Sequence, residues 1–171
     1  MNKKNKYHLQ KKWLYIILGC MVADQASKML IQINLLLHSS INIIPNFLSF
    51  SYIDNPGIAF GLDPFNSPLI LLLISVVAIF FIFKILFNSL EESKLVQFSL
   101  SLIIGGALGN FIDRFFSTFE IMNYSGVVDF IEIGIGKYKF PYIFNLADSF
   151  ITVGIILYFI SFIKIRFYND K

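Results

Sequence analysis

Cysteine and histidine are nearly absent from this chain of 171 residues, which contains one cysteine and two histidines. Cys20 alone cannot form an intrachain disulfide, and with only His8 and His38 beside it no zinc-type cluster can be assembled. Both histidines precede residue 40, so no Ser, Cys or His arrangement suits a covalent nucleophile either. We therefore expect neither a metal nor a cofactor.

Charge is scarce as well. Charged residues make up 15% of the chain, whereas an average soluble domain carries roughly 25%. The sequence is 56% hydrophobic, has 20 phenylalanines and has a mean hydropathy of +0.69. This composition indicates an integral membrane protein, with residues 1–171 as a single domain. The net charge of +3 is too small to imply a nucleic-acid partner.

Four stretches are long and apolar enough to cross a membrane, which takes about 20 residues. They cover residues 13–30, 69–87, 95–112 and 149–167. The polar turn at 88–94 makes the second and third a hairpin. Gly105 and Gly109 lie four apart in the third stretch, a spacing that lets another helix approach closely. The predicted fold is an all-α membrane protein with four transmembrane helices and a small extracytoplasmic β element.

The basic residues predict the orientation. They gather before the first span, beside the turn at 88–94 and at the end of the chain: Lys3, Lys4, Lys6, Lys11, Lys12, Lys84, Lys94, Lys164, Arg166 and Lys171. Residues 29–67 contain no Lys or Arg. The positive-inside rule therefore places both termini and the turn in the cytoplasm. An outer β element at 34–66 and an outer loop at 115–147 then face outside, although Lys137 and Lys139 dilute the second assignment.

Two segments between the spans have strand character. Residues 47–52 alternate aromatic and polar side chains, and residues 127–135 are a second candidate. The sequence Asn55-Pro56-Gly57 is a turn signal. These patterns predict a small sheet on the membrane surface.

Polar and charged side chains near the outer ends of the first and third spans indicate a structural or functional role, because charge is costly in a bilayer. Asp24 and Lys28 share one helix face and form either a structural ion pair or a contact with substrate or a catalytic carboxylate. Asn110 and Arg114 lie one turn apart and either cap the helix and contact headgroups, or orient a carboxylate or a peptide carbonyl. We expect Asp113 to point away from that face and to stay solvated or pair locally.

Two further aspartates, each among apolar neighbours, form a candidate catalytic pair. Asp148 at the start of the fourth span has a structural explanation as a helix N-cap, and Asp129 has one as an acid on a surface strand. Together, with Asn145 between them, they indicate a dyad. Like charges about 3 Å apart cannot both ionise, so one aspartate keeps a proton while the other activates water. The apparent pKa values then belong to the pair.

Five motifs in order, on four predicted spans, resemble the family of bacterial lipoprotein signal peptidase, also called signal peptidase II. They are DQASK at 24–28, NPGIAFG at 55–61, GGALGNFIDR at 105–114, VVDF at 127–130 and FNLADS at 144–149. The resemblance implies an intramembrane aspartic protease of the bacterial cytoplasmic membrane. Such enzymes remove the signal peptide from prolipoproteins just before a cysteine that carries diacylglycerol, and the cyclic depsipeptide globomycin blocks them.

The resemblance also assigns residues. The family's catalytic pair falls on Asp129 and Asp148, at the extracytoplasmic face. The substrate-binding or dyad-supporting positions are Asp24, Lys28, Asn55, Gly57, Asn110, Arg114 and Asn145. The expected partners are prolipoprotein substrates and membrane lipid, with the protein itself a monomer. Two features depart from the family: Ile58 replaces a small residue, and the segment at 115–125 is longer than usual, which leaves the shape of the outer cover open.

Two other functions compete. A proton-coupled transporter would carry acids across the depth of the bilayer and show internal repeats. Alternatively, the lysines, the apolar run and Leu18-Gly19-Cys20 could be the lipidation signal of a lipoprotein precursor. However, that run spans only residues 13–19 before Cys20, and the helix continues to Asp24, which favours Cys20 as a packing residue.

Overall fold

Four helices and a small antiparallel sheet make up the computed structural model, which describes residues 3–57, 67–89, 93–136 and 138–169. The helices are α1 (Lys3–Asn34), α2 (Pro68–Asn88), α3 (Lys94–Thr118) and α4 (Leu146–Asn169). Within the described part of the chain, all four are long and apolar enough to span a membrane. The four-helix prediction is therefore confirmed, and the chain is a multi-pass membrane protein.

Local sequence explains where the helices begin. Pro68 occupies the first turn of α2, where its missing N–H removes no helical bond. The Ser93 hydroxyl accepts a hydrogen bond from the Val96 N–H and caps α3. At its other end α3 runs to Thr118, six residues past the predicted limit of 112. Residues 115–118 are thus helical rather than part of an outer loop.

The sheet has the strand order β1-β2-β3-β4 and is antiparallel throughout. Its strands are β1 (Ser40–Ile44), β2 (Leu48–Asn55), β3 (Val127–Ile135) and β4 (Tyr138–Lys139). The predicted strand at 127–135 is confirmed, and the one predicted at 47–52 extends to Asn55. A short 3-10 turn, η2 (Ile121–Asn123), lies between α3 and β3.

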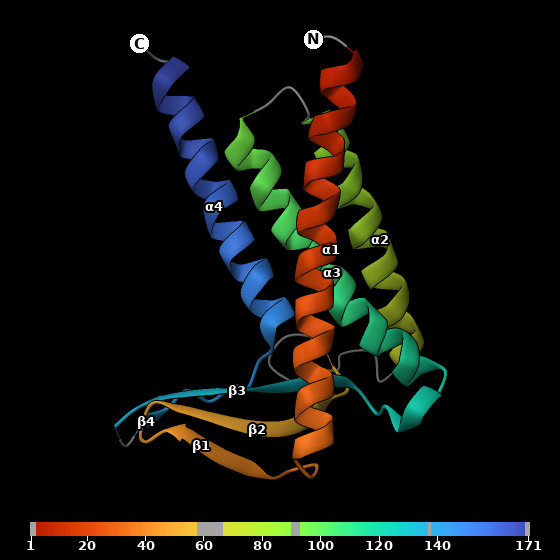
Figure 1. Ribbon diagram of the computed structural model, residues 1–171, viewed down its shortest axis with the longest axis vertical. Helices are drawn as coiled ribbons and strands as arrows, with labels where there is room; N and C mark the ends of the chain where they lie inside the picture. Colours follow the sequence, from red (N-terminus) through yellow and green to blue (C-terminus); the bar gives the residue numbers. More distant parts are fainter. Residues whose placement is uncertain (1–2, 58–66, 90–92, 137, 170–171) are drawn as a thin grey trace.

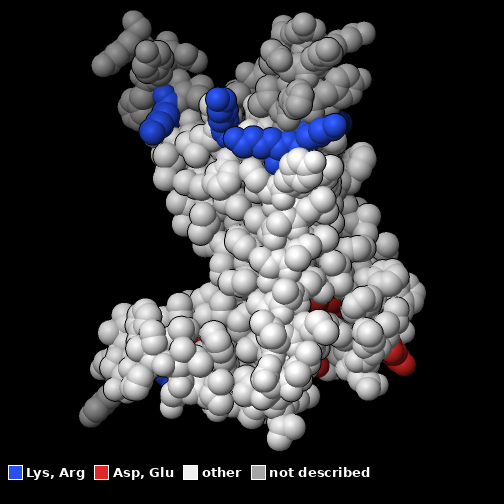
Figure 2. All heavy atoms as spheres, in the orientation of Figure 1, with Lys and Arg blue, Asp and Glu red and all other residues white. Residues whose placement is uncertain are grey.

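The sheet closes one end of the helix bundle, here called the sheet end, while α1 begins and α4 ends at the opposite end (Figure 1). Most visible Lys and Arg side chains form a band near that opposite end, and the visible Asp and Glu side chains lie toward the sheet (Figure 2). The bundle is therefore polarised in charge along its long axis.

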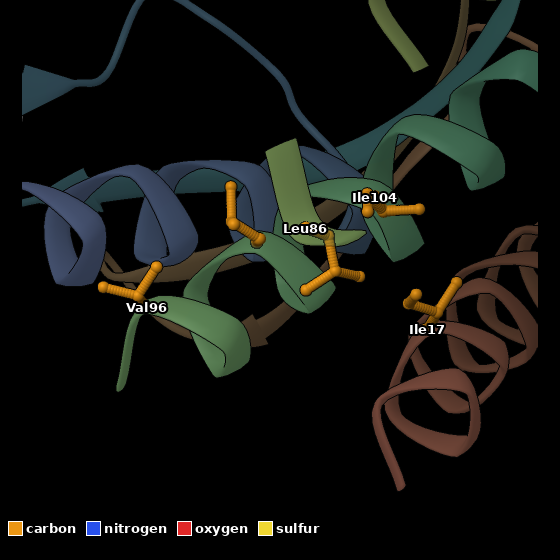
Figure 3. Packing of buried hydrophobic residues seen from close by; sticks show 5 residues of the cluster. Ile17, Leu86, Val96 and Ile104 are labelled. Atoms are coloured by element: carbon orange, nitrogen blue, oxygen red, sulfur yellow. The ribbon is translucent and has the colours of Figure 1, made fainter. Parts of the chain in front are cut away.

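Helix α3 is the most enclosed of the four spans and packs against each of the others. Ile17 of α1, Leu86 of α2, and Val96, Leu100 and Ile104 of α3 form a buried cluster (Figure 3). Large apolar side chains elsewhere, such as Phe80 and Phe159, are exposed, as expected for surfaces that contact lipid.

Glycine lets α1 and α3 come together as the sequence predicts. A Cβ added at Gly105 would lie 2.6 Å from Cys20 Cβ, and one at Gly109 would lie 2.5 Å from Asp24 Oδ2. Cys20 is buried in the middle of α1 at this contact. Its role is therefore packing, and the reading of the chain as a lipoprotein precursor has no support from the structure.

Candidate active site

Asp129 lies on β3 and is almost completely buried. Its Oδ1 accepts a hydrogen bond of 2.7 Å from Asn145 Nδ2, and its Oδ2 accepts one of 3.0 Å from Asn55 Nδ2. The strand register explains the second bond. Asn55 pairs with Val127, so its side chain lies diagonally across from Asp129 on the same sheet face.

Asp148 lies in the first turn of α4 but is not its N-cap, which corrects that structural explanation. Asn145 has this role, because its Oδ1 accepts from the Asp148 N–H at 2.9 Å. In return, Asp148 Oδ2 accepts from the Asn145 N–H at 3.2 Å, which makes a capping box. Asp148 Oδ1 accepts from Asn110 Nδ2 at 2.8 Å. Both oxygens of Asp148 therefore have donors.

Both aspartates line one cavity of about 830 Å³ between α2, α3, α4 and β3. Asn55, Asn110 and Arg114 also line it. The remaining wall is mostly apolar and includes Leu71 and Ile74 of α2, Val153 of α4, and Phe144 from the segment before α4. Two carboxylates and several polar side chains therefore share a cavity with an apolar surface that suits an apolar ligand.

Asn145 joins the two aspartates. Its Nδ2 donates to Asp129 Oδ1, while its backbone N–H and Oδ1 hold Asp148. The same Nδ2 also lies 3.0 Å from Asn110 Oδ1. Asn145 is completely buried, so water does not compete for these bonds. The residue thus sets the relative placement of the two carboxylates.

Of the two alternatives for Asp24 and Lys28, the structure shows the ion pair, with Lys28 Nζ 2.8 Å from Asp24 Oδ2. Lys28 Nζ is also 2.8 Å from Asp113 Oδ2 and 2.9 Å from Asn110 Oδ1. An ammonium has three N–H donors, so each donor of Lys28 has a partner. Asp24 Oδ1 accepts from the Ala147 N–H at 2.8 Å, which ties α1 to the start of α4.

The prediction that Asp113 points away from the face of Asn110 and Arg114, and stays solvated or pairs locally, is wrong. Asp113 is completely buried, pairs with Lys28 and accepts hydrogen bonds from Gln25 Nε2 at 2.9 Å and the Val128 N–H at 3.1 Å. The sequence held a signal for this: Asp113 lies one turn after Gly109, whose spacing already marks the packed face of α3. Because Val128 precedes Asp129, Asp113 anchors the strand beside the proposed dyad.

The remaining predicted residues are also near the cavity. Asn55 Oδ1 accepts from the Gly57 N–H at 3.0 Å, so Gly57 closes the turn that carries Asn55. Arg114 lies on the cavity wall, within electrostatic range of Asp148, Asp113 and Asp129. Ile58, where the sequence departs from the family, lies outside the described residues.

Electrostatics separates Asp129 from an ordinary carboxylate. Burial, followed by the negative charge of Asp148, raises the pKa of Asp129 from 3.8 to about 7. The hydrogen bond from Asn55, the positive charge of Lys28 and the hydrogen bond from Asn145 act in the opposite direction. Asp129 therefore keeps its proton to a much higher pH than a solvated aspartate.

Known proteins of one family are similar to this chain over most of its length. The family profile Signal peptidase (SPase) II matches residues 16–164. A lipoprotein signal peptidase of Clostridium tetani is 40% identical over 92% of this chain and 96% of its own length. One from Staphylococcus epidermidis is 38% identical over 98% of each chain.

Solved structures of bacterial membrane enzymes are similar in fold. One at 2.3 Å resolution has a TM-score of 0.72 and 29% identity, over 90% of this chain and 88% of that one. Another, at 1.9 Å, has a TM-score of 0.71 with the same identity and covers 94% of its own chain. The match of family profile, relatives and fold over nearly the whole sequence shows that this chain belongs to the signal peptidase II family.

Proposed function

We propose that the chain is an aspartic endopeptidase that removes signal peptides from diacylglyceryl-modified prolipoproteins by cutting before the lipidated cysteine. The observation that carries the proposal is the pair Asp129 and Asp148 on one cavity, joined by the buried amide of Asn145. Two carboxylates with different environments supply an acid and a base without a metal.

The two environments suggest which aspartate holds the proton. Asp148 lies in the first turn of α4, and both of its carboxylate oxygens accept hydrogen bonds from N–H groups. Asp129, whose pKa is raised to about 7, is then the protonated member. The N–H groups of Asn110 and Asn145 hold the Asp148 carboxylate in place.

Cleavage proceeds by attack of water on the scissile carbonyl carbon. Asp148 accepts a proton from the water, and Asp129 gives its proton to the carbonyl oxygen, which forms a tetrahedral diol. Collapse of the diol breaks the C–N bond, and the Asp148 proton passes to the leaving amine. The diol proton returns to Asp129, so the dyad ends with one proton as it began.

The apolar cavity wall and the charge distribution suggest how the substrate is held. The hydrophobic segment of the signal peptide packs against α2 and α4, beside Ile74 and Val153. The positive band of Figure 2 faces the cytoplasm, so the sheet end and the dyad lie at the extracytoplasmic face of the bacterial cytoplasmic membrane. We expect a monomer that globomycin inhibits.

The test is cleavage of a diacylglyceryl-modified prolipoprotein by the purified protein in detergent or liposomes. Asp129→Asn and Asp148→Asn each lower kcat by more than about a thousandfold because each removes an acid–base group. Glu132→Gln is the matched control, since it neutralises an acid on the same strand that pairs with Lys139. Retained cleavage in both dyad variants rejects the mechanism, and equal cleavage of an unlipidated substrate rejects the proposed specificity.

A further inference from the structure

Residues 119–126, here called the brace, connect α3 to β3 along a strained path. Glu120, Met122 and Asn123 have positive φ angles of 53°, 55° and 59°. Side chains other than glycine rarely adopt this conformation, so surrounding contacts must hold it in place. The brace is therefore a connection whose backbone conformation is fixed by its contacts.

Its side-chain contacts involve residues that do not line the cavity. The Tyr124 hydroxyl donates to Gln32 Oε1 of α1 at 3.0 Å, and the Tyr124 ring packs edge-on against Phe116 of α3 with centroids 5.3 Å apart. The Ser125 hydroxyl donates to Asp54 Oδ2 of β2. Two helices and one strand are thus tied together through two consecutive residues.

The brace is linked to Asn55 through strand β2. Asp54 and Asn55 are neighbours on β2, so their side chains point to opposite faces of the sheet. Ser125 holds Asp54 on one face, while Asn55 bonds Asp129 on the other. The backbone also touches here, because a Cβ added at Gly126 would lie 2.5 Å from the Asn55 carbonyl carbon.

We propose that Tyr124 and Ser125 are positioning residues for the reaction, acting through Asp54 and Asn55 on Asp129. This inference rests on the proposed function. It assigns the long connection after α3 the task of fixing the amide that bonds one member of the dyad. The brace residues do not touch the substrate and take no part in proton transfer.

The pH dependence of cleavage reports on this coupling. The Asn55 hydrogen bond lowers the pKa of Asp129, so a displaced Asn55 raises that pKa further. The charged groups that act on Asp129 are Asp148 of α4, Lys28 of α1 and Arg114 of α3. Removing a neutral hydroxyl from the brace changes none of these charges.

Ser125→Ala and Tyr124→Phe each remove one hydroxyl and test the proposal. We expect kcat to fall about fivefold, roughly the effect of one hydrogen bond, with KM within about twofold. The falling limb of the pH–kcat profile, which reports the pKa of Asp129, moves to higher pH by about half a pH unit. Ser125→Thr keeps the hydroxyl and restores the wild-type profile. Matched controls are Ser39→Ala, because the Ser39 hydroxyl donates to the nearby Leu36 carbonyl oxygen, and Tyr138→Phe, because Tyr138 is highly exposed.

The outcomes separate the two proposals. If the wild type does not cleave the prolipoprotein, the proposed function fails. If the wild type cleaves and the brace variants keep its kcat and pH profile, the brace inference is overturned while the function stands. Lower thermal stability with an unchanged pH profile also overturns it, because a purely structural role predicts that result.

Discussion

Lys28 Nζ donates a hydrogen bond of 2.9 Å to Asn110 Oδ1, and this bond connects a buried ion cluster to the proposed dyad. Asn110 Oδ1 also receives Asn145 Nδ2 at 3.0 Å. With two donors at its oxygen, the Asn110 amide must present its NH₂ group to Asp148. A lysine that does not line the cavity thereby orients a group that does.

Replacing Lys28 with Met leaves Asp24 and Asp113 buried without their shared cation. Breaking a buried ion pair in this way costs about 3–5 kcal/mol, so we expect a large loss of unfolding free energy in detergent. Lys139→Met is the control, because Lys139 is 64% exposed in its pair with Glu132 and such pairs contribute roughly 0–1 kcal/mol. Equal losses in the two variants would contradict the assigned role of the buried cluster.

Asp113→Asn tests the residue that sequence reasoning misplaced. Asp113 Oδ2 accepts from both Lys28 and the Val128 N–H, and an amide nitrogen at that position can accept from neither. We expect the unfolding free energy to fall by about 1–3 kcal/mol and cleavage to slow, because β3 shifts beside Asp129. Thermal unfolding and cleavage assays measure the two effects, and wild-type values for both would show that the contact is dispensable.

Asn145 has two separable roles. Asn145→Ala removes the helix cap, worth about 1 kcal/mol, together with the bond to Asp129. Asn145→Ser keeps a capping hydroxyl but loses the bridging amide. We expect Ser to restore most of the thermal stability and little of the cleavage rate. Recovery of both by Ser would mean that capping alone explains the residue.

The raised pKa of Asp129 predicts how stability varies with pH. The folded protein holds this proton to about pH 7, whereas the unfolded chain releases it near 3.8. The stabilising contribution is therefore complete below about pH 4 and is lost as pH rises to about 7. The unfolding free energy of the wild type minus that of Asp129→Asn isolates this contribution. We expect this difference to fall as pH rises, and a difference that grows with pH would contradict the prediction.

Activity should follow the same group. If Asp129 supplies the proton, kcat falls as pH rises above about 7. Asn55→Ala removes a hydrogen bond that lowers this pKa, so the falling limb moves to higher pH. If the falling limb of Asn55→Ala stays at the wild-type pH, Asn55 does not influence the pKa of Asp129 during the reaction.

Close contact between α1 and α3 predicts a steric effect at Gly105. A Cβ there would lie 2.9 Å from the Ile17 carbonyl oxygen, a backbone atom that cannot move aside. Gly105→Ala should therefore destabilise by about 1–3 kcal/mol. Gly19→Ala is the control: an added Cβ at Gly19 meets nothing within 4 Å, so helix propensity predicts a gain of up to about 1 kcal/mol. Thermal unfolding of both variants checks the contrast.

The sequence by itself determined the spans, the two main strands and the placement of Asp24 and Lys28 on one helix face. These features depend on local patterns: about 20 apolar residues for a span, alternation for a strand, and a spacing of four on a helix. The bounds of the helices differed at their ends, where a helix continues beyond the predicted apolar stretch. For example, α3 extends to Thr118, and α4 begins at Leu146 because Asn145 caps it.

Only the tertiary structure decided which partners satisfy the buried polar groups. Helix periodicity says which residues share a face, but not that Lys28 meets carboxylates from both α1 and α3. Nor does it say that Asn145 Nδ2 reaches Asp129 on β3, or that Ser125 meets Asp54 behind the strand. The physical reason is that a buried charge or amide is stable only with all its partners in place, and these come from distant segments.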